Sequence, residues 1–278
     1  MSVLLFTIIV LLGAFLAGLL GSLTGLGGGV VIIPLLTLVL GVDLHYAIGA
    51  SIISVIATSS GSAAAYVKEG ITNIRIGMFL EIATTISAIF GAVITIYINP
   101  SYIAVIFGLI LLFSAAMMIR KKVDRSDNDT SGKLAVWLKL NGTYPTADGV
   151  QKYAVHNVIG GFMMMFVAGI ISGLLGIGSG ALKVIAMDNI MRIPFKVSTT
   201  TSNFMMGVTA AASAVVYFHR GQIDPGIAMP VTIGVLVGST LGAKILIRSK
   251  PEKLKVVFAV VVTFLALQMI YNGLSGRI

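Results

Sequence analysis

Long apolar runs alternate with short polar gaps along the whole chain. Most of these runs match the ~20 residues that an α-helix needs to cross a membrane, and charges inside them are rare. In the first half of the chain they predict helices at 3–24, 29–40, 47–67, 76–98 and 102–119. In the second half they predict helices at 154–175, 180–191, 197–218, 226–247 and 254–271. The pattern therefore predicts an all-α polytopic membrane protein.

The two sets of runs are copies of one another at a constant offset of 151 residues. A glycine-rich stretch occurs in both, as Gly-Leu-Gly-Gly-Gly at 25–29 and Gly-Ile-Gly-Ser-Gly at 176–180. Identical residues coincide far beyond these stretches, among them Ser51 with Ser202, Thr58 with Thr209, and Tyr66 with Tyr217. Internal similarity of this extent indicates a duplicated unit.

A polar and charged segment separates the two copies. Residues 120–152 contain seven Lys or Arg residues, and the sequence Asn-Gly-Thr-Tyr-Pro at 141–145 predicts a turn. We therefore expect three parts in the chain: a first transmembrane repeat at 1–119, an inter-repeat linker at 120–152 and a second transmembrane repeat at 153–278.

The basic residues lie mainly in the gaps between apolar runs, and they are distributed unevenly. When the runs are threaded through a membrane, 15 Lys and Arg residues fall on one side and 2 on the other, with Lys183 and Lys244 inside apolar runs. The positive-inside rule makes the richer side, which includes the linker, cytoplasmic. Corresponding gaps in the two copies have opposite basic character. This predicts two repeats inserted in opposite orientations, with both chain termini outside the cytoplasm.

Composition narrows the classes of function. Hydrophobic residues make up 57% of the chain and charged residues 10%, which excludes a soluble protein. The formal net charge of +9 reflects membrane topology, so no nucleic-acid partner is expected. Cysteine is absent, and the three histidines, His45, His156 and His219, lie at the edges of runs without a metal-ligand spacing. An enzyme, a cofactor and a metal site are therefore not expected.

Inverted insertion requires an odd number of net crossings in each repeat. Three runs per repeat cross once each, so the run that contains the glycines has to enter and return on the same side, as a helical hairpin with the glycines at its tip. Its return arm at 29–40 has 12 residues, which as a helix is roughly 18 Å, against about 30 Å of hydrocarbon. We expect each repeat to be a glycine-tipped helical hairpin plus three transmembrane helices, with eight full crossings and two short re-entrant arms in all.

Two oppositely inserted repeats bring their glycine tips together near the middle of the membrane, where many secondary transporters bind their substrate. The helix after each tip begins with unpaired amides and partial positive charge, which attract anions. Glycine lets the backbone approach such a ligand closely. The glycines expected to bind substrate are Gly25, Gly27, Gly28, Gly29, Gly176, Gly178 and Gly180. The alternative is that they serve close helix packing, the role we expect for Gly18, Gly21, Gly91 and Gly242.

Two charged residues lie inside apolar runs and are candidates for the same site. Lys183 follows the second tip, and a lysine at the membrane centre costs about 2.5–3.5 kcal/mol on insertion scales. This cost favours a role in anion binding, although snorkelling to the inner face and pairing with Asp188 are alternatives. Three roles are open for Glu81: it pairs with Lys183, it relays protons, or it sits at the inner interface close to Arg75.

Small polar residues gather at the starts of the runs that follow the hairpins. They are Ser51 and Ser54 in the first repeat, and Thr199, Thr200, Thr201, Ser202 and Asn203 in the second. Their hydroxyl and amide donors, with Ser179 of the second tip, are suited to complete an oxyanion shell. Each hydroxyl taken alone is better explained by a hydrogen bond to its own helix backbone.

These residues together resemble the TauE/SafE sulfite exporter family. The resemblance is carried by Gly-Leu-Leu-Gly-Ser-Leu-Thr-Gly-Leu-Gly-Gly-Gly at 18–29 with Pro34, by the weaker copy Gly-Leu-Leu-Gly-Ile-Gly-Ser-Gly at 173–180, and by the small polar starts at Ser51 and Ser202. It implies a permease of the bacterial or archaeal cytoplasmic membrane that moves sulfite or related organosulfur anions, usually outward. The chain departs from the family pattern at Ser179, Ile185 and Thr200.

The sequence thus predicts an exporter of sulfite or a related sulfur-containing anion that works by alternating access, with the anion and the lipid bilayer as its partners. An inside-negative potential favours the exit of an anion by about 2.3 kcal/mol per charge per 100 mV, so no further energy source is required. The alternatives are an anion channel, a transporter of another small anion such as a carboxylate, and proton-coupled transport through Glu81.

Overall fold

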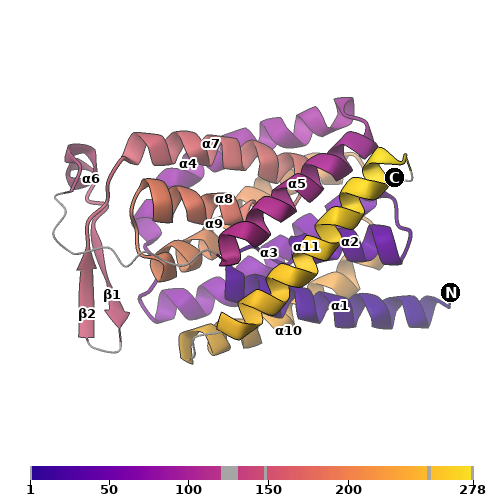
Figure 1. The fold of residues 1–278 in the computed structure, drawn as a ribbon, viewed down its shortest axis with the longest axis horizontal. Helices are drawn as coiled ribbons and strands as arrows, with labels where there is room; N and C mark the ends of the chain where they lie inside the picture. The colour runs from indigo at the N-terminus through magenta and orange to yellow at the C-terminus, as the bar shows by residue number, and fades with distance from the viewer. Residues whose placement is uncertain (1, 120–130, 147–148, 249–251, 277–278) are drawn as a thin grey trace.

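The computed structural model describes residues 2–119, 131–146, 149–248 and 252–276. The charged start of the linker, 120–130, lies outside the described residues, and so do residues 249–251 between the last two predicted helices. The described part is mostly helical, as the apolar runs predict (Figure 1).

Helices form over nearly the predicted ranges. In the first half they are α1 (Val3–Thr24), α2 (Gly29–Pro34), α3 (Leu44–Lys68), α4 (Ile74–Ile94) and α5 (Pro100–Ile119). In the second half they are α7 (Val158–Leu175), α8 (Gly180–Ile185), α9 (Phe195–His219), α10 (Pro225–Arg248) and α11 (Glu252–Leu274). The short elements are the π-helices η1 (Leu35–Val39) and η3 (Ala186–Ile190), which extend α2 and α8, and the 3-10 helix η2 (Thr95–Tyr97) after α4.

Local signals in the sequence fix several helix ends. Asp43 caps α3 by accepting a hydrogen bond from the amide of His45 at 2.8 Å, and Asn73 caps α4 in the same way. At the other end, α1 and α7 stop at Gly25 and Gly176, which adopt the left-handed conformation that commonly ends a helix. The glycines at 25 and 176 therefore end the two helices and mark the start of each tip.

Six of the described helices are long and apolar enough to cross a membrane: α1, α3, α4, α5, α7 and α10. The sequence predicts eight such crossings, and the two others are α9 and α11. α9 has 25 residues, but the polar run 198–203 lowers its hydropathy. Within the described residues, α11 and the second arm of the first hairpin contain the shorter apolar helices Ala259–Leu274 and Gly29–Val39. The chain is thus a multi-pass membrane protein.

The beginning and the end of the chain lie at the same end of the molecule. In Figure 1, α1 begins and α11 ends at the end opposite the strands β1 (Gly142–Thr146) and β2 (Gly149–Tyr153) of the linker. α5 and α11 pack against each other and cross one face of the bundle obliquely. The linker and the termini are therefore separated by the length of the helices.

The main helix contacts run between the two halves of the chain. α1 packs along α10, α4 packs along α7, and α3 packs against both α9 and α10. At the offset of 151 residues α1 corresponds to α7 and α10 to α4. The pairs α1–α10 and α7–α4 are therefore the same packing contact, made once by each half. Glycines allow the close approach: a Cβ added to Gly91 would overlap the carbonyl oxygen of Ile170, and one added to Gly242 would lie 2.5 Å from that of Leu19.

The linker contains structure that its sequence does not predict. A short helix, α6 (Lys133–Trp137), precedes an antiparallel hairpin in which Gly142 pairs with Tyr153 and Thr146 with Gly149. The turn predicted at 141–145 is therefore wrong, because these residues enter strand β1 and the chain reverses after it. Asn141 braces the base of the hairpin, since its Oδ1 accepts from the amide of Val155 at 2.9 Å.

The linker is docked on the start of α4. Asn73 Nδ2 donates to the carbonyl oxygen of Leu140 at 3.1 Å and to the hydroxyl of Tyr153 at 2.7 Å. Arg75 donates to the carbonyl oxygen of Lys139 at 2.8 Å. The hairpin β1–β2 is thus held against the helix that carries Glu81.

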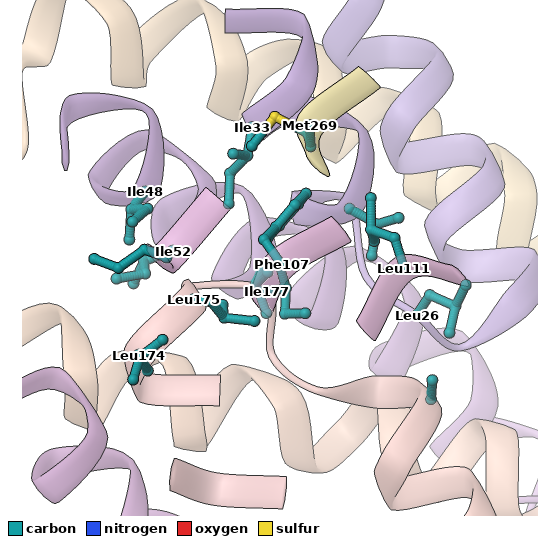
Figure 2. Close-up of a cluster of buried hydrophobic side chains, with 14 of the residues drawn as sticks. Leu26, Ile33, Ile48, Ile52, Phe107, Leu111, Leu174, Leu175, Ile177 and Met269 are labelled. Atoms are coloured by element: carbon teal, nitrogen blue, oxygen red, sulfur yellow. The ribbon is translucent and has the colours of Figure 1, made fainter. Parts of the chain in front are cut away.

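A buried apolar cluster lies beside the glycine tips (Figure 2). Leu26 of the first tip and Ile177 of the second belong to it, together with Phe107 and Leu111 of α5 and Met269 of α11. Leu26 and Ile177 coincide at the offset of 151 residues, so both tips bury their apolar residue in the same cluster. The burial of these side chains fixes the tips from the side of α5 and α11.

Candidate functional site

Two glycine turns form the tips of the hairpins. Gly25 has φ of 76° and Gly176 has φ of 66°, and they are followed by Gly27 and Gly178 with φ of 82° and 72°. Left-handed backbone costs an ordinary L-residue roughly 1–2 kcal/mol. Both turns therefore depend on glycine, at the same places in each copy.

The two tips contact each other through their backbones. A Cβ built on Gly180 would overlap the carbonyl oxygen of Gly25, and one built on Gly29 would lie 3.2 Å from the carbonyl oxygen of Gly176. Gly25 corresponds to Gly176 and Gly29 to Gly180, so one contact is made twice. All of the predicted site glycines are buried, and the lack of side chains lets the two backbones meet.

Hydroxyl groups from α3 and α9 contact the tips. Ser51 Oγ donates to the carbonyl oxygen of Gly176 at 2.7 Å, which links the first half to the second tip. Ser202 Oγ donates to the carbonyl oxygen of Gly180 at 3.3 Å. Two of the predicted polar residues therefore lie at the tips, where their hydroxyls hold backbone carbonyls.

The other predicted polar residues make different contacts. Ser54 and Thr200 donate to backbone carbonyls of their own helices, as isolated hydroxyls in membrane helices often do. Thr201 accepts from the backbone amide that precedes α4, at 3.1 Å. Asn203 Nδ2 donates to the carbonyl oxygen of Ser22 at 3.2 Å, whereas its buried Oδ1 has no hydrogen-bond partner. Thr199 packs against Gly25, and its buried Oγ1 has no hydrogen-bond partner either. Of these five residues, Thr199 therefore has a free hydroxyl and Asn203 has a free acceptor.

Lys183 and Glu81 meet inside the molecule. The side chain of Lys183 is fully buried, and its Nζ donates to Thr209 Oγ1 at 2.5 Å. Thr209 Oγ1 in turn donates to Glu81 Oε1 at 2.5 Å, and Thr85 donates to the same oxygen at 3.1 Å. Glu81 is 7% exposed. The ammonium and the carboxylate are therefore joined by one threonine hydroxyl.

These contacts bear on the roles that the sequence leaves open for the two charged residues. Lys183 does not snorkel, because its side chain is fully buried. Glu81 lies on the side of α4 that faces Thr209, while Arg75 is engaged by the linker carbonyl of Lys139. The pairing of Glu81 with Lys183, one of the three roles considered, is what the contacts support.

Ser179 differs from its counterpart in the first tip. It adopts φ of 44°, unusual for a residue other than glycine, and its buried Oγ has no hydrogen-bond partner. Its counterpart is Gly28, where an added Cβ would lie 2.9 Å from Thr58 Oγ1. At the offset of 151 residues Thr58 corresponds to Thr209, the threonine that joins Lys183 to Glu81. The second tip thus carries side-chain chemistry that the first tip lacks.

The sequence prediction misses Thr209 as a site residue. Its counterpart Thr58 contacts the first tip, accepting from the amide of Gly28 at 3.3 Å. The identity of the two threonines at the offset of 151 residues is the signal that could have found them, because it marks the position at which α3 and α9 each reach a tip.

Two tyrosines, also absent from the prediction, brace the hairpins. Tyr66 donates to the carbonyl oxygen of Ser22 at 3.0 Å, and Tyr217 donates to that of Gly173 at 2.9 Å. Both tyrosines are fully buried. Ser22 corresponds to Gly173, so the last turn before each tip is held by the same bond.

Removal of either tyrosine hydroxyl is expected to destabilise the protein by about 1 kcal/mol, because a buried carbonyl loses a donor. Thermal unfolding of the detergent-purified Tyr66→Phe and Tyr217→Phe variants measures this as a lower midpoint. Tyr97→Phe is the control, since Tyr97 is 83% exposed. Midpoints equal to that of the control in both variants would contradict the bracing role.

Comparison with known proteins finds similar sequences over nearly the whole chain. A family profile described as "Sulfite exporter TauE/SafE" matches residues 10–269. The "Probable membrane transporter protein YunE" of Bacillus subtilis (strain 168) is 29% identical over 277 residues, covering 97% of this chain and 98% of the relative. The "Probable membrane transporter protein MJ0441" of Methanocaldococcus jannaschii is 24% identical and covers 96% of both chains. No solved structure matches the chain.

Proposed function

Because the chain belongs to the TauE/SafE sulfite exporter family, we propose that this membrane transporter exports sulfite or a related sulfur-containing anion across the cytoplasmic membrane. Both relatives are described as probable membrane transporter proteins, which supports transport but names no substrate. The nature of the substrate is therefore argued from the residues at the tips.

The observation that carries the proposal is the fully buried Lys183 next to the second tip. An ammonium has three N–H donors, and among the described residues Thr209 takes one of them. Ser179 Oγ of the second tip is buried and has no hydrogen-bond partner, so its hydroxyl is a further free donor. A small oxyanion satisfies these free donors, because charge-assisted hydrogen bonds to sulfonate or sulfite oxygens are strong.

The anion is bound between the two tips, and alternating access moves it. The reciprocal packing of α1 on α10 and of α7 on α4 supports two repeats of inverted orientation, which are typical of such carriers. The linker and the chain ends lie at opposite ends of the molecule, which supports a cytoplasmic linker and extracytoplasmic termini. In this mechanism the two halves rock about the tip contact and expose the anion first to one side and then to the other.

Binding of the purified protein to anions tests the substrate. Sulfite is expected to raise the thermal unfolding midpoint, because a ligand at one hundred times its Kd stabilises the folded state by about 2.7 kcal/mol. Sulfate, thiosulfate, a sulfonate and acetate are compared at equal ionic strength. Stabilisation by acetate alone would overturn the choice of sulfur anions.

Flux into proteoliposomes tests the mechanism. A carrier that rocks about a binding site is expected to saturate as the sulfite concentration rises. Flux that stays linear in concentration and greatly exceeds the turnover of a carrier would indicate a channel instead. The two measurements are independent, so the substrate and the mechanism are tested separately.

A further inference from the structure

We propose that Glu81 couples anion transport to the movement of a proton. Glu81 neutralises Lys183 while the site is empty, and it takes up a proton when the anion replaces it as the partner of Lys183. This inference rests on the proposed function, because the same lysine binds the anion.

The link between the two charges runs through a single hydroxyl. Lys183 Nζ donates to Thr209 Oγ1, and Thr209 Oγ1 donates to Glu81 Oε1, each at 2.5 Å. A threonine hydroxyl has one hydrogen to donate, so Thr209 transmits the charge of Lys183 to one carboxylate oxygen only. An anion that accepts from the other N–H groups of Lys183 therefore takes over the positive charge that compensates Glu81.

The second carboxylate oxygen of Glu81 is the place for the proton. Glu81 Oε2 is buried and has no hydrogen-bond partner, whereas Oε1 accepts from both Thr209 and Thr85. An ionised carboxylate that is buried and loses its counter-charge is strongly disfavoured and takes up a proton instead. The geometry thus leaves one oxygen committed to hydrogen bonds and the other free to be protonated.

Among the described residues, no charged side chain other than Lys183 is linked to Glu81 by a hydrogen bond, directly or through Thr209; Arg220, just after α9, donates to the carbonyl oxygen of Ala92 near the opposite end of α4. Within the described residues of α7 there is no titratable side chain. On α9 the titratable residues are Lys196 near its start and Tyr217 and His219 near its end, whereas Thr209 lies in between. Arg75 on α4 itself donates to the linker. Lys183 is therefore the charged group to which the protonation of Glu81 responds.

The cycle balances in charge and in protons. In the empty site the positive charge of Lys183 and the negative charge of Glu81 cancel. In the loaded site the anion accepts hydrogen bonds from Lys183, and the Glu81 carboxylate accepts a proton from solvent water on the side to which the site is open. Release of the anion on the other side reverses both steps. One proton moves with each anion, so a dianion still carries one negative charge outward and the inside-negative potential still favours its exit.

Proton uptake on binding provides the test. Isothermal titration calorimetry with sulfite, in two buffers of different ionisation enthalpy, measures the protons taken up per anion bound. The wild type is expected to take up one more proton per sulfite than Glu81→Gln, in which the amide stands in for the protonated acid. The ionisation of sulfite itself cancels in this difference. As pH rises, the affinity of the wild type relative to that of Glu81→Gln is expected to fall by up to tenfold per pH unit.

The controls separate the possible failures. Glu69→Gln removes an exposed carboxylate at the end of α3 and is expected to behave as the wild type. Equal proton uptake by the wild type and Glu81→Gln, with normal sulfite binding, overturns the coupling and leaves the proposed function standing. Absence of sulfite binding by the wild type overturns both.

Infrared spectroscopy of the wild type tests the proposal even if Glu81→Gln does not fold. Infrared difference spectra of the wild type are expected to gain the C=O stretching band of a protonated carboxylic acid when sulfite is added. The band is expected to shift in frequency in Glu81→Asp. Sulfite binding without such a band in the wild type contradicts the proposal.

Discussion

Gly180→Ala is expected to reduce sulfite transport to less than about a tenth of the wild-type rate. The added Cβ would overlap the carbonyl oxygen of Gly25 and would lie 2.8 Å from Met206 Sδ. A backbone carbonyl cannot turn away as a side chain does, so the two tips have to separate. Overpacking of this kind typically costs 1–3 kcal/mol. The rate of sulfite uptake by proteoliposomes, corrected for the amount of folded protein, measures the effect.

Gly13→Ala is the matched control for this variant. Gly13 also lies inside a membrane helix, but the three atoms nearest to its added Cβ all belong to the side chain of Leu35, which can rotate away. This variant is expected to transport at close to the wild-type rate. Equal rates for Gly180→Ala and Gly13→Ala would refute a functional role for the contact between the tips.

Lys183→Met is expected to abolish sulfite binding and to destabilise the protein. Methionine fills a similar space but leaves the buried Glu81 without its counter-charge, and the loss of one member of a buried charge pair costs about 3–5 kcal/mol. Thermal unfolding measures the stability, and the shift caused by sulfite measures the binding. Lys244→Met is the control, because Lys244 is exposed near the end of α10.

The double variant Lys183→Met/Glu81→Gln separates the two effects. Removal of both charges is expected to restore most of the stability, because no buried charge is left unpaired. Sulfite binding is expected to stay absent, because the ammonium that binds the anion is still missing. Recovery of binding together with stability would mean that Lys183 acts only as a structural partner of Glu81.

Helix positions follow from the apolar pattern because a membrane helix has to satisfy its own backbone. The predicted second arm at 29–40 matches α2 and η1 within one residue, and the arm at 180–191 matches α8 and η3 equally well. The sequence does not predict that each arm ends as a π-helix. Pro34 suggests a cause in the first copy, yet η3 forms after Ile185, which is not a proline. The π-geometry therefore does not require a proline at this position.

The candidate site is only partly readable from the sequence. The glycines and Lys183 stand out because glycine clusters and charges are rare in membrane segments. Thr209 does not stand out, because threonine is common in membrane helices and usually bonds to its own backbone. Its role depends on α4, α8 and α9 meeting at one point, and that meeting is a tertiary contact between residues 81, 183 and 209.

The linker hairpin escapes prediction for a different reason. Strands β1 and β2 are exposed and short, so no alternation of buried and exposed apolar residues marks them. Their stability depends on docking to Asn73 and Arg75, which lie about 65 to 80 residues earlier in the chain. The residues in and around the hairpin therefore do not predict the helix on which it docks.

The exchange of helices between the two halves also has a consequence for how the protein is made. The first half is synthesised and inserted while α7 and α10, the packing partners of α4 and α1, do not yet exist. The glycine-lined faces of α1 and α4 therefore contact lipid until their partner helices have been synthesised and inserted. A chain that stops before α7 has no completed site, because the second tip, Lys183 and Thr209 are all synthesised after it or at its end. Final assembly of this transporter is thus a step that follows membrane insertion of nearly the whole polypeptide.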